Sequence, residues 1–155
     1  MGLDMYLTRT IFIGGCYANR KVTGKVAISI KGQPVKVAAK NIDSIITRVG
    51  YWRNANAVHH WFVNNYAGGI DDCTPICLNA SDLIKLRNIC QSILNLPSGA
   101  KRNRQALKLL PPKDGPAFNS GKIDDRYYDD LELTVEILQD IPEDDPEYYE
   151  YRASW

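Results

Sequence analysis

Apolar and polar residues alternate along the beginning of the chain. The apolar side chains fall on odd positions, namely Leu3, Met5, Leu7, Ile11 and Ile13, with Arg9 as the exception. A period of two is typical of a strand, so the pattern predicts one over residues 3–13. A similar alternation over residues 25–37 is interrupted by a Lys31-Gly32-Gln33-Pro34 turn, which predicts a hairpin in the same small antiparallel sheet.

The period becomes helical after residue 41. The apolar residues that recur three and four positions apart are Ile42, Ile45, Ile46 and Val49. This spacing predicts a helix that continues to about Tyr66, where Gly68 and Gly69 can end it. Gly50 interrupts the pattern, so a kink or two separate helices remain open.

Two further helices follow in the sequence. Ser81 is a suitable N-cap for a helix over residues 81–96, and a last helix is predicted over about 124–141. Between them, residues 97–122 contain four prolines and three glycines. Such a composition predicts a long loop, with a short helix around residues 105–110.

These elements predict an α+β fold, with a small N-terminal antiparallel sheet packed against about three helices. At 155 residues the chain is long enough for one compact core. We assign residues 1–141 to a single α+β domain. Residues 142–155 are rich in carboxylates and aromatic side chains, and we interpret them as an acidic aromatic C-terminal tail.

Charge and cysteine content narrow the expected partners and location. The chain has 19 Lys and Arg against 18 Asp and Glu, a net charge of +1, so nucleic acid is not an expected partner. No apolar run approaches the roughly 20 residues that span a bilayer, so we predict neither a membrane partner nor secretion. In the cytosol the four cysteines, Cys16, Cys73, Cys77 and Cys90, are expected to be reduced.

Several segments are distinctive beyond their periodicity. They are the opening "GLDMYL", the central "YWRNANAVHHWFV", the following "DDC", the later "LLP", and then Gly115, Phe118, Ser120, Asp124, Tyr127 and "DL" at 130–131. In this order and spacing they resemble a family of small phage and prophage proteins, over most of residues 2–138. One departure is "GPAFNS" at 115–120, where family members carry an aromatic "GFFFGS" loop.

The resemblance implies a non-enzymatic protein that acts on host processes in the cytosol of a bacterial host. The name phosphoglycerate kinase is sometimes attached to such proteins. We exclude that activity, because the chain is too short for two nucleotide-binding domains and lacks a glycine-rich strand-to-helix phosphate motif.

Polar residues interrupt the apolar side of the predicted helix around residue 56. At about 100° per residue, one row comprises Trp52, Asn56, His59 and Val63, flanked by Arg53 and His60. A buried amide or imidazole without a hydrogen-bond partner costs about 1–3 kcal/mol. Two interpretations remain open: a closed internal network, in which Arg53 pairs with a carboxylate, and a pocket whose partner is a ligand.

In the pocket interpretation these side chains suit a nucleotide-like ligand. Arg53 has the planar fork that matches phosphate, and Trp52 or Trp61 offers a stacking face. Asn56 can pair with a base edge or a hydroxyl group. The predicted ligand-binding residues are Trp52, Arg53, Asn56, His59, Trp61, Asp72, Phe118, Asp124 and Tyr127. No catalytic residue, metal site or cofactor is predicted.

Two other groups of residues give weaker chemical signals. Asp71 and Asp72 could accept ribose hydroxyls or hold a divalent cation, but adjacent carboxylates in a loop more commonly cap a turn. Cys73 and Cys77, with His59 upstream, form only part of a zinc site, because no second close pair completes four ligands. Buried free thiols are the simpler interpretation of the two cysteines.

We therefore expect a phage accessory protein that counters host defence by binding and sequestering a small nucleotide-derived signalling molecule, without turnover. One alternative is an inhibitor that binds a host defence enzyme through the basic stretch at 101–108 and the tail at 142–155. Another is a small nucleotide hydrolase or phosphodiesterase with His59 as general base. The tyrosine-rich tail is also suited to contact a second subunit, so a homo-oligomer remains open.

Overall fold

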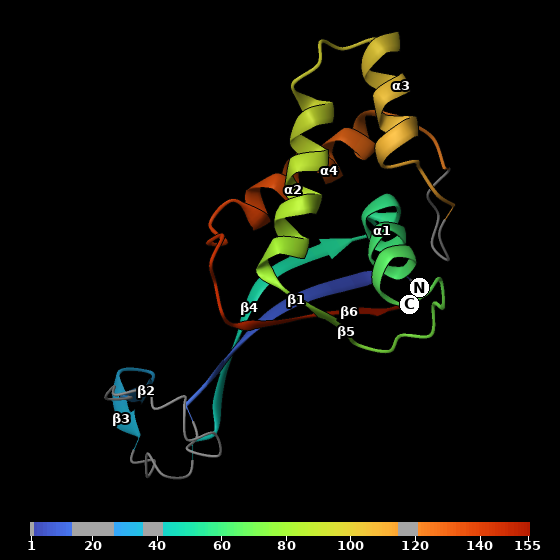
Figure 1. Ribbon diagram of the computed structural model, residues 1–155. Coiled ribbons are helices and arrows are strands. Elements are labelled where there is room, and N and C mark those ends of the chain that lie inside the picture. The colour runs from blue at the N-terminus through green and yellow to red at the C-terminus, as the bar shows by residue number, and fades with distance from the viewer. Residues whose placement is uncertain (1, 14–26, 36–41, 115–120) are drawn as a thin grey trace.

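The fold is built on an antiparallel sheet with helices on one side (Figure 1). The computed structural model describes residues 2–13, 27–35, 42–114 and 121–155. The strand order of the main sheet is β4-β1-β6-β5, with β1 at Asp4–Phe12, β4 at Ser44–Arg53, β5 at Ile76–Leu78 and β6 at Tyr148–Ser154. The predicted α+β class is confirmed, with four helices within the described residues where about three were expected.

Side chains of Asp residues stabilise the starts of two of the four helices in the described residues. These four helices are α1 (Asn56–Tyr66), α2 (Ala80–Leu94), α3 (Ala100–Leu109) and α4 (Asp125–Leu138). At the start of α2 the Asp82 carboxylate accepts a hydrogen bond from the Asn79 N–H group, and at the start of α4 the Asp124 carboxylate accepts from the Tyr127 N–H group. Among the described residues no helix has the length and apolar character required to cross a bilayer.

The long loop expected over residues 97–122 contains a complete helix. α3 covers the basic stretch, and its start follows Gly99, which has a φ of 130°. Arg102 of α3 lies over the Tyr128 ring of α4 at 4.0 Å from the ring centroid. The basic residues are therefore carried on a helix that packs beside α2 and α4.

The alternation in β1 separates a buried side of the sheet from an open one. Leu3, Met5 and Leu7 are 0% exposed and belong to the core under the helices. Tyr6 and Thr8 belong to the opposite side, where they line a shallow trough across the sheet. The alternation thus gives the sheet one covered and one uncovered face.

The helix predicted over residues 42–49 is wrong, because this segment is strand β4. It pairs antiparallel with β1 from Asp4 opposite Arg53 to Phe12 opposite Ser44. Its β-branched side chains favour a strand. Gly50 leaves room for α4 rather than kinking a helix, since a Cβ at this position would collide with the Ile137 side chain.

The C-terminal segment interpreted as a tail contributes a central strand. β6 lies between β1 and β5, with Leu7 opposite Tyr151 and Ile76 opposite Tyr151 on its other side. Tyr149 and Tyr151 are 1% exposed, and the Tyr151 ring stacks on Phe62 with centroids 4.1 Å apart. Residues 148–154 are therefore part of the domain, because their alternate apolar side chains complete its core.

The predicted hairpin is present but does not join the main sheet. β2 (Ile28–Ile30) and β3 (Gln33–Val35) form a separate two-stranded sheet. The turn residues Lys31 and Gly32 both have positive φ, 50° and 76°, as a tight hairpin turn requires. Both strands are exposed on both faces, so the hairpin adds nothing to the core.

Candidate functional site

Helix α1 carries two buried polar side chains one turn apart. Asn56 and His59 are each 5% exposed. The helix is fixed at its start by Asn54, which has a φ of 62° and whose side-chain oxygen accepts a hydrogen bond from the Leu3 N–H group at 2.8 Å. Val58 and Phe62 bury the other side of the helix in the core. Both polar side chains therefore have fixed positions.

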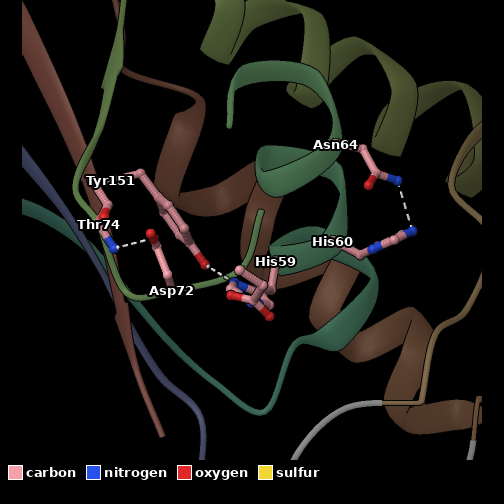
Figure 2. Close-up of polar contacts among 7 residues, drawn as sticks. His59, His60, Asn64, Asp72, Thr74 and Tyr151 are labelled. Carbon is pink, nitrogen blue, oxygen red and sulfur yellow. Dashed lines mark hydrogen bonds and ion pairs between the residues drawn. The ribbon is translucent and has the colours of Figure 1, made fainter. Parts of the chain in front are cut away.

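His59 belongs to a closed hydrogen-bonded network. Its Nδ1 lies 2.7 Å from the Tyr151 hydroxyl (Figure 2). Its Nε2 lies 3.0 and 3.1 Å from the two carboxylate oxygens of Asp71. Because a carboxylate only accepts, Nε2 carries a proton and donates the hydrogen bond to Asp71. Burial raises the pKa of Tyr151, which keeps that hydroxyl protonated.

Asn56 has no such partners. Neither its side-chain oxygen nor its side-chain nitrogen has a hydrogen-bond partner among the described residues, although both atoms are buried. Native structures leave few buried polar side chains in this state, and each one asks for an explanation. The Asn56 amide is therefore the best indication of a ligand in the part of the chain that the structure describes.

The Asn56 side chain lines a small hollow between α1 and α4. The hollow, which we call the α1 hollow, is lined by Asn56, Ala57, Pro112, Lys113, Gly121, Lys122, Tyr127 and Asp130. Its cavity volume is about 20 Å³, which is room for one small group. Pockets that take up a whole small ligand are usually about 300–1,000 Å³, so this hollow suits one chemical group rather than an entire nucleotide.

The N-terminus of α1 opens at this hollow. No side chain caps the helix, and its first turn contains no acidic residue. The N–H groups of Ala57 and Val58 have no backbone acceptor among the described residues. A helix N-terminus carries a partial positive charge of about half an elementary charge, which favours a negatively charged group nearby.

Charged side chains surround the mouth of the hollow. Lys113 and Lys122 are exposed cations that line it, and Asp130 is a partly buried carboxyl group on α4. Burial raises the pKa of Asp130 to about 7, and the nearby Asp129 and Asp124 act in the same direction, against Arg126. At neutral pH Asp130 is therefore close to half protonated, and it can donate as well as accept a hydrogen bond.

The structure brings only some of the predicted site residues together. Asn56 and Tyr127 line the α1 hollow, although the Tyr127 hydroxyl is already bound to the Leu110 carbonyl oxygen at 2.7 Å. His59 lies one turn away in its own network. Phe118 lies outside the described residues.

The other predicted residues have structural roles. Trp52 is 0% exposed and donates its indole N–H to the Thr134 hydroxyl at 2.9 Å, while Trp61 packs on Phe62 and Tyr66. Neither indole is available to stack on a base. Asp124 is the N-cap of α4, as described above.

Arg53 and Asp72 also depart from the predicted cluster. Arg53 ends β4 on the exposed surface, three residues before the start of α1, and forms no ion pair among the described residues. The row that joined it to Asn56 required a continuous helix, which the strand replaces. Asp72 accepts a hydrogen bond from the Thr74 N–H group at 3.0 Å, so it stabilises a turn (Figure 2).

The three charged residues of the hollow were not predicted from the sequence, namely Lys113, Lys122 and Asp130. They come from two segments that are more than fifty residues from Asn56. One weak signal was available, because Asp130 precedes Leu131 of the buried α4 stripe and is thereby placed at its edge.

The cysteines provide no metal site in the described residues. Cys73 and Cys77 are exposed free thiols, which corrects the expectation that they are buried, and Cys90 is buried. No group of three or more His, Cys, Asp and Glu side chains that could hold a metal ion occurs in the described ranges.

A wider trough crosses the open face of the sheet. It is lined by Tyr6, Thr8, Thr10, Ile46, Arg48, Glu150, Arg152 and Ser154. Most of these side chains are in contact with water and carry both signs of charge, so the trough contains no group that lacks a partner in the way that Asn56 does. The α1 hollow is therefore the stronger candidate.

Comparisons of the chain with protein-family models, with curated proteins and with solved structures gave no match.

Proposed function

We propose that the protein binds a small nucleotide-derived molecule and holds it without turnover, with the α1 hollow as the anchoring point. The observation that carries the proposal is the Asn56 amide, which is buried without a hydrogen-bond partner in the described structure. An amide offers an acceptor and two donors, a combination that pairs with base edges, hydroxyls and phosphate oxygens. A ligand that satisfies this group recovers about 1–3 kcal/mol of desolvation.

The size of the hollow determines how such a ligand is held. One group enters the hollow, and the remainder lies outside on the surface beside Lys113 and Lys122. These two cations attract an anionic compound during binding.

The state of His59 favours binding over hydrolysis. A general base needs a free nitrogen within reach of the proton that it removes. Both ring nitrogens of His59 are engaged, by Tyr151 and by Asp71, and His59 does not line the α1 hollow. These contacts count against the hydrolase alternative, which used His59 as general base.

The burial of the C-terminal strand counts against the alternative of a tail that binds a host enzyme. Tyr149 and Tyr151, which were expected to contact a host enzyme, are buried in the sheet. The basic residues of α3 remain on the surface, but nothing about their arrangement identifies a protein partner.

The resemblance to phage proteins supplies the biological context of the proposal. Sequestering a nucleotide-derived signal would allow a phage protein to silence a host defence that depends on it. This function requires affinity and abundance but no catalysis, which agrees with a buried, unsatisfied amide next to cations.

The test is native mass spectrometry of the protein purified from bacterial cells that make candidate nucleotide signals, followed by calorimetry with each compound retained. We expect a phosphorylated compound that is lost in Asn56→Leu. Asn88→Leu is the matched control, because Asn88 is an exposed asparagine on α2. If wild-type protein retains no such compound and binds none in calorimetry, or if both variants bind equally, the proposal is wrong.

A further inference from the structure

The chemistry of the α1 hollow indicates which group of a ligand it holds. Two independent observations coincide there. The first turn of α1 has no capping side chain and no acidic residue, and its free N–H groups point out of the helix start. The Asn56 amide, nine-tenths buried and without a partner in the described structure, lines the same space. Together these donors surround a position suited to negative charge.

The size and the rim of the hollow agree with a compact anion. A cavity of about 20 Å³, partly open to solvent, has room for one small group but not for a base with its sugar. Lys113 and Lys122 line the hollow from two segments of the chain, so two cations reach the anion in addition to the helix N-terminus.

We propose that the α1 hollow is an oxyanion site, in which the α1 N-terminus, the Asn56 amide, Lys113 and Lys122 hold a phosphate group of the ligand. This inference rests on the proposed function for the identity of the whole ligand, but the site itself is testable with a simple anion. The base and sugar lie outside the hollow.

Among the described residues, Asp130 is the one carboxyl group that lines the hollow, and it makes the site sensitive to pH. As a carboxylate it repels an oxyanion, and as a protonated acid it donates a hydrogen bond to it. The other charged and titratable groups around it are Arg126, Asp129 and Asp124 on α4, Lys113 and Lys122 at the rim, Tyr127, and His60 on α1, which faces Lys113.

The direction of the pH effect follows from these groups. With a pKa of about 7, Asp130 is mostly protonated at pH 6.5 and mostly ionised at pH 8, so the affinity for an anion falls several-fold between them. Burial lowers the pKa of His60, so His60 is mainly neutral across this range and contributes little.

Sulfate is the probe of choice, because it keeps the same charge over this pH range whereas phosphate does not. The experiment is a sulfate titration followed by backbone amide NMR at pH 6.5 and pH 8. We expect saturable shifts of the Ala57 and Val58 signals, with affinity several-fold weaker at pH 8. Asn56→Leu should lose this binding, while Asp130→Asn should bind equally at both pH values.

Three controls separate the site from general anion effects. Asp129→Asn, next to Asp130 but exposed, should keep the pH dependence, and so should His60→Gln. The start of α2, which Asp82 already caps, should not respond to sulfate. If shifts at α1 are absent, do not saturate, or persist in Asn56→Leu, the oxyanion site is wrong.

The result is distinguishable from a failure of the proposed function. If a nucleotide binds in a way that depends on Asn56 but sulfate causes no shifts, the proposed function stands and the oxyanion site is wrong. Sulfate binding at α1 without retention of any nucleotide compound would keep the site and overturn the function.

Discussion

Asn56 and His59 lie one turn apart on the same helix and are equally buried, yet their surroundings differ completely. His59 has a partner on each ring nitrogen, contributed by β6 and by the loop after α1. Asn56 has none in the described structure and lines a hollow instead. The difference shows that a polar residue on an apolar helix side identifies a site only once its partners are known.

The largest expected loss of stability comes from removing His59, the residue of the pair whose ring nitrogens both have hydrogen-bond partners. His59→Ala leaves the buried Tyr151 hydroxyl without its hydrogen-bond partner and removes the ring packing against Trp155. We expect the free energy of unfolding to fall by about 3 kcal/mol, measured by urea denaturation.

His60→Ala is the matched control, because the neighbouring histidine is half-buried and its hydrogen-bond partner in the described structure is the exposed Asn64, at 2.7 Å (Figure 2). Its loss should stay below about 1 kcal/mol. Equal losses in the two variants would contradict the network.

The second largest effect on stability is expected from Asp130, the carboxyl group that lines the α1 hollow. Asp130 ionises near pH 3.8 when unfolded and near pH 7 when folded, so the folded state binds more protons between these values. Stability contributed by the protonated form is lost as the pH rises through this window. Allowing for partial exposure, we expect Asp130→Asn to exceed wild type by about 1–2 kcal/mol at pH 8 and by much less at pH 4.5.

Urea denaturation at both pH values measures this difference. The exposed Asp129→Asn serves as the reference, since it should show the same stability relative to wild type at both. An Asp130→Asn advantage that does not grow with pH would mean that the carboxyl group is not buried as described.

A smaller effect is expected at the outer end of the network. Asp71 is 39% exposed on its side chain, and in Asp71→Asn the amide oxygen can still accept from His59 Nε2. We expect a loss of about 0.5–1 kcal/mol in urea denaturation. A loss as large as that of His59→Ala would show that the ion pair, rather than Tyr151, stabilises the ring.

The smallest effect on stability is expected from Asn56→Leu. No hydrogen bond within the described structure is lost, and apolar surface replaces an unsatisfied amide, so the free energy of unfolding should be unchanged or rise by up to about 1 kcal/mol. A thermal-shift measurement without ligand tests this. A loss above about 2 kcal/mol would mean that the amide has an internal partner.

Local signals predicted those elements whose ends are set by neighbouring residues. Asp124 caps α4, and the glycines at 68 and 69, with φ of 61° and 80°, follow α1 as expected. β1 was also predictable, since apolar and polar residues alternate from Leu3 to Leu7 and the burial of their side chains alternates in the same way. In each case the deciding interactions lie within a few positions of the chain.

Neighbouring residues alone could not decide whether the segment 42–49 forms a helix or a strand. Ile42, Ile45 and Val49 fit a helical period, whereas the β-branched content of the same residues fits a strand. The choice depends on β1, which supplies the pairing partner from a distant part of the sequence. Gly50 was interpreted as an interruption of a helix. In the structure its lack of a side chain leaves room for Ile137 of α4.

The candidate site was predictable only at Asn56 and Tyr127. Lys113, Lys122 and Asp130 have no periodic relation to Asn56, and the fold alone assembles them. Arg53 was predicted to share a site with Asn56 because the two are close in sequence. The turn at Asn54 separates them in the structure.

The position of β6 has a consequence for biosynthesis. The central pair of the sheet joins Thr8 to Glu150, 142 residues later, so the β1 edge that pairs with β6 stays unpaired on the ribosome until Tyr148–Ser154 has been made. Closing so long a loop is slow compared with forming the helices. The nascent chain therefore passes through a stage with preformed helices and an open strand edge, when chaperones are most needed.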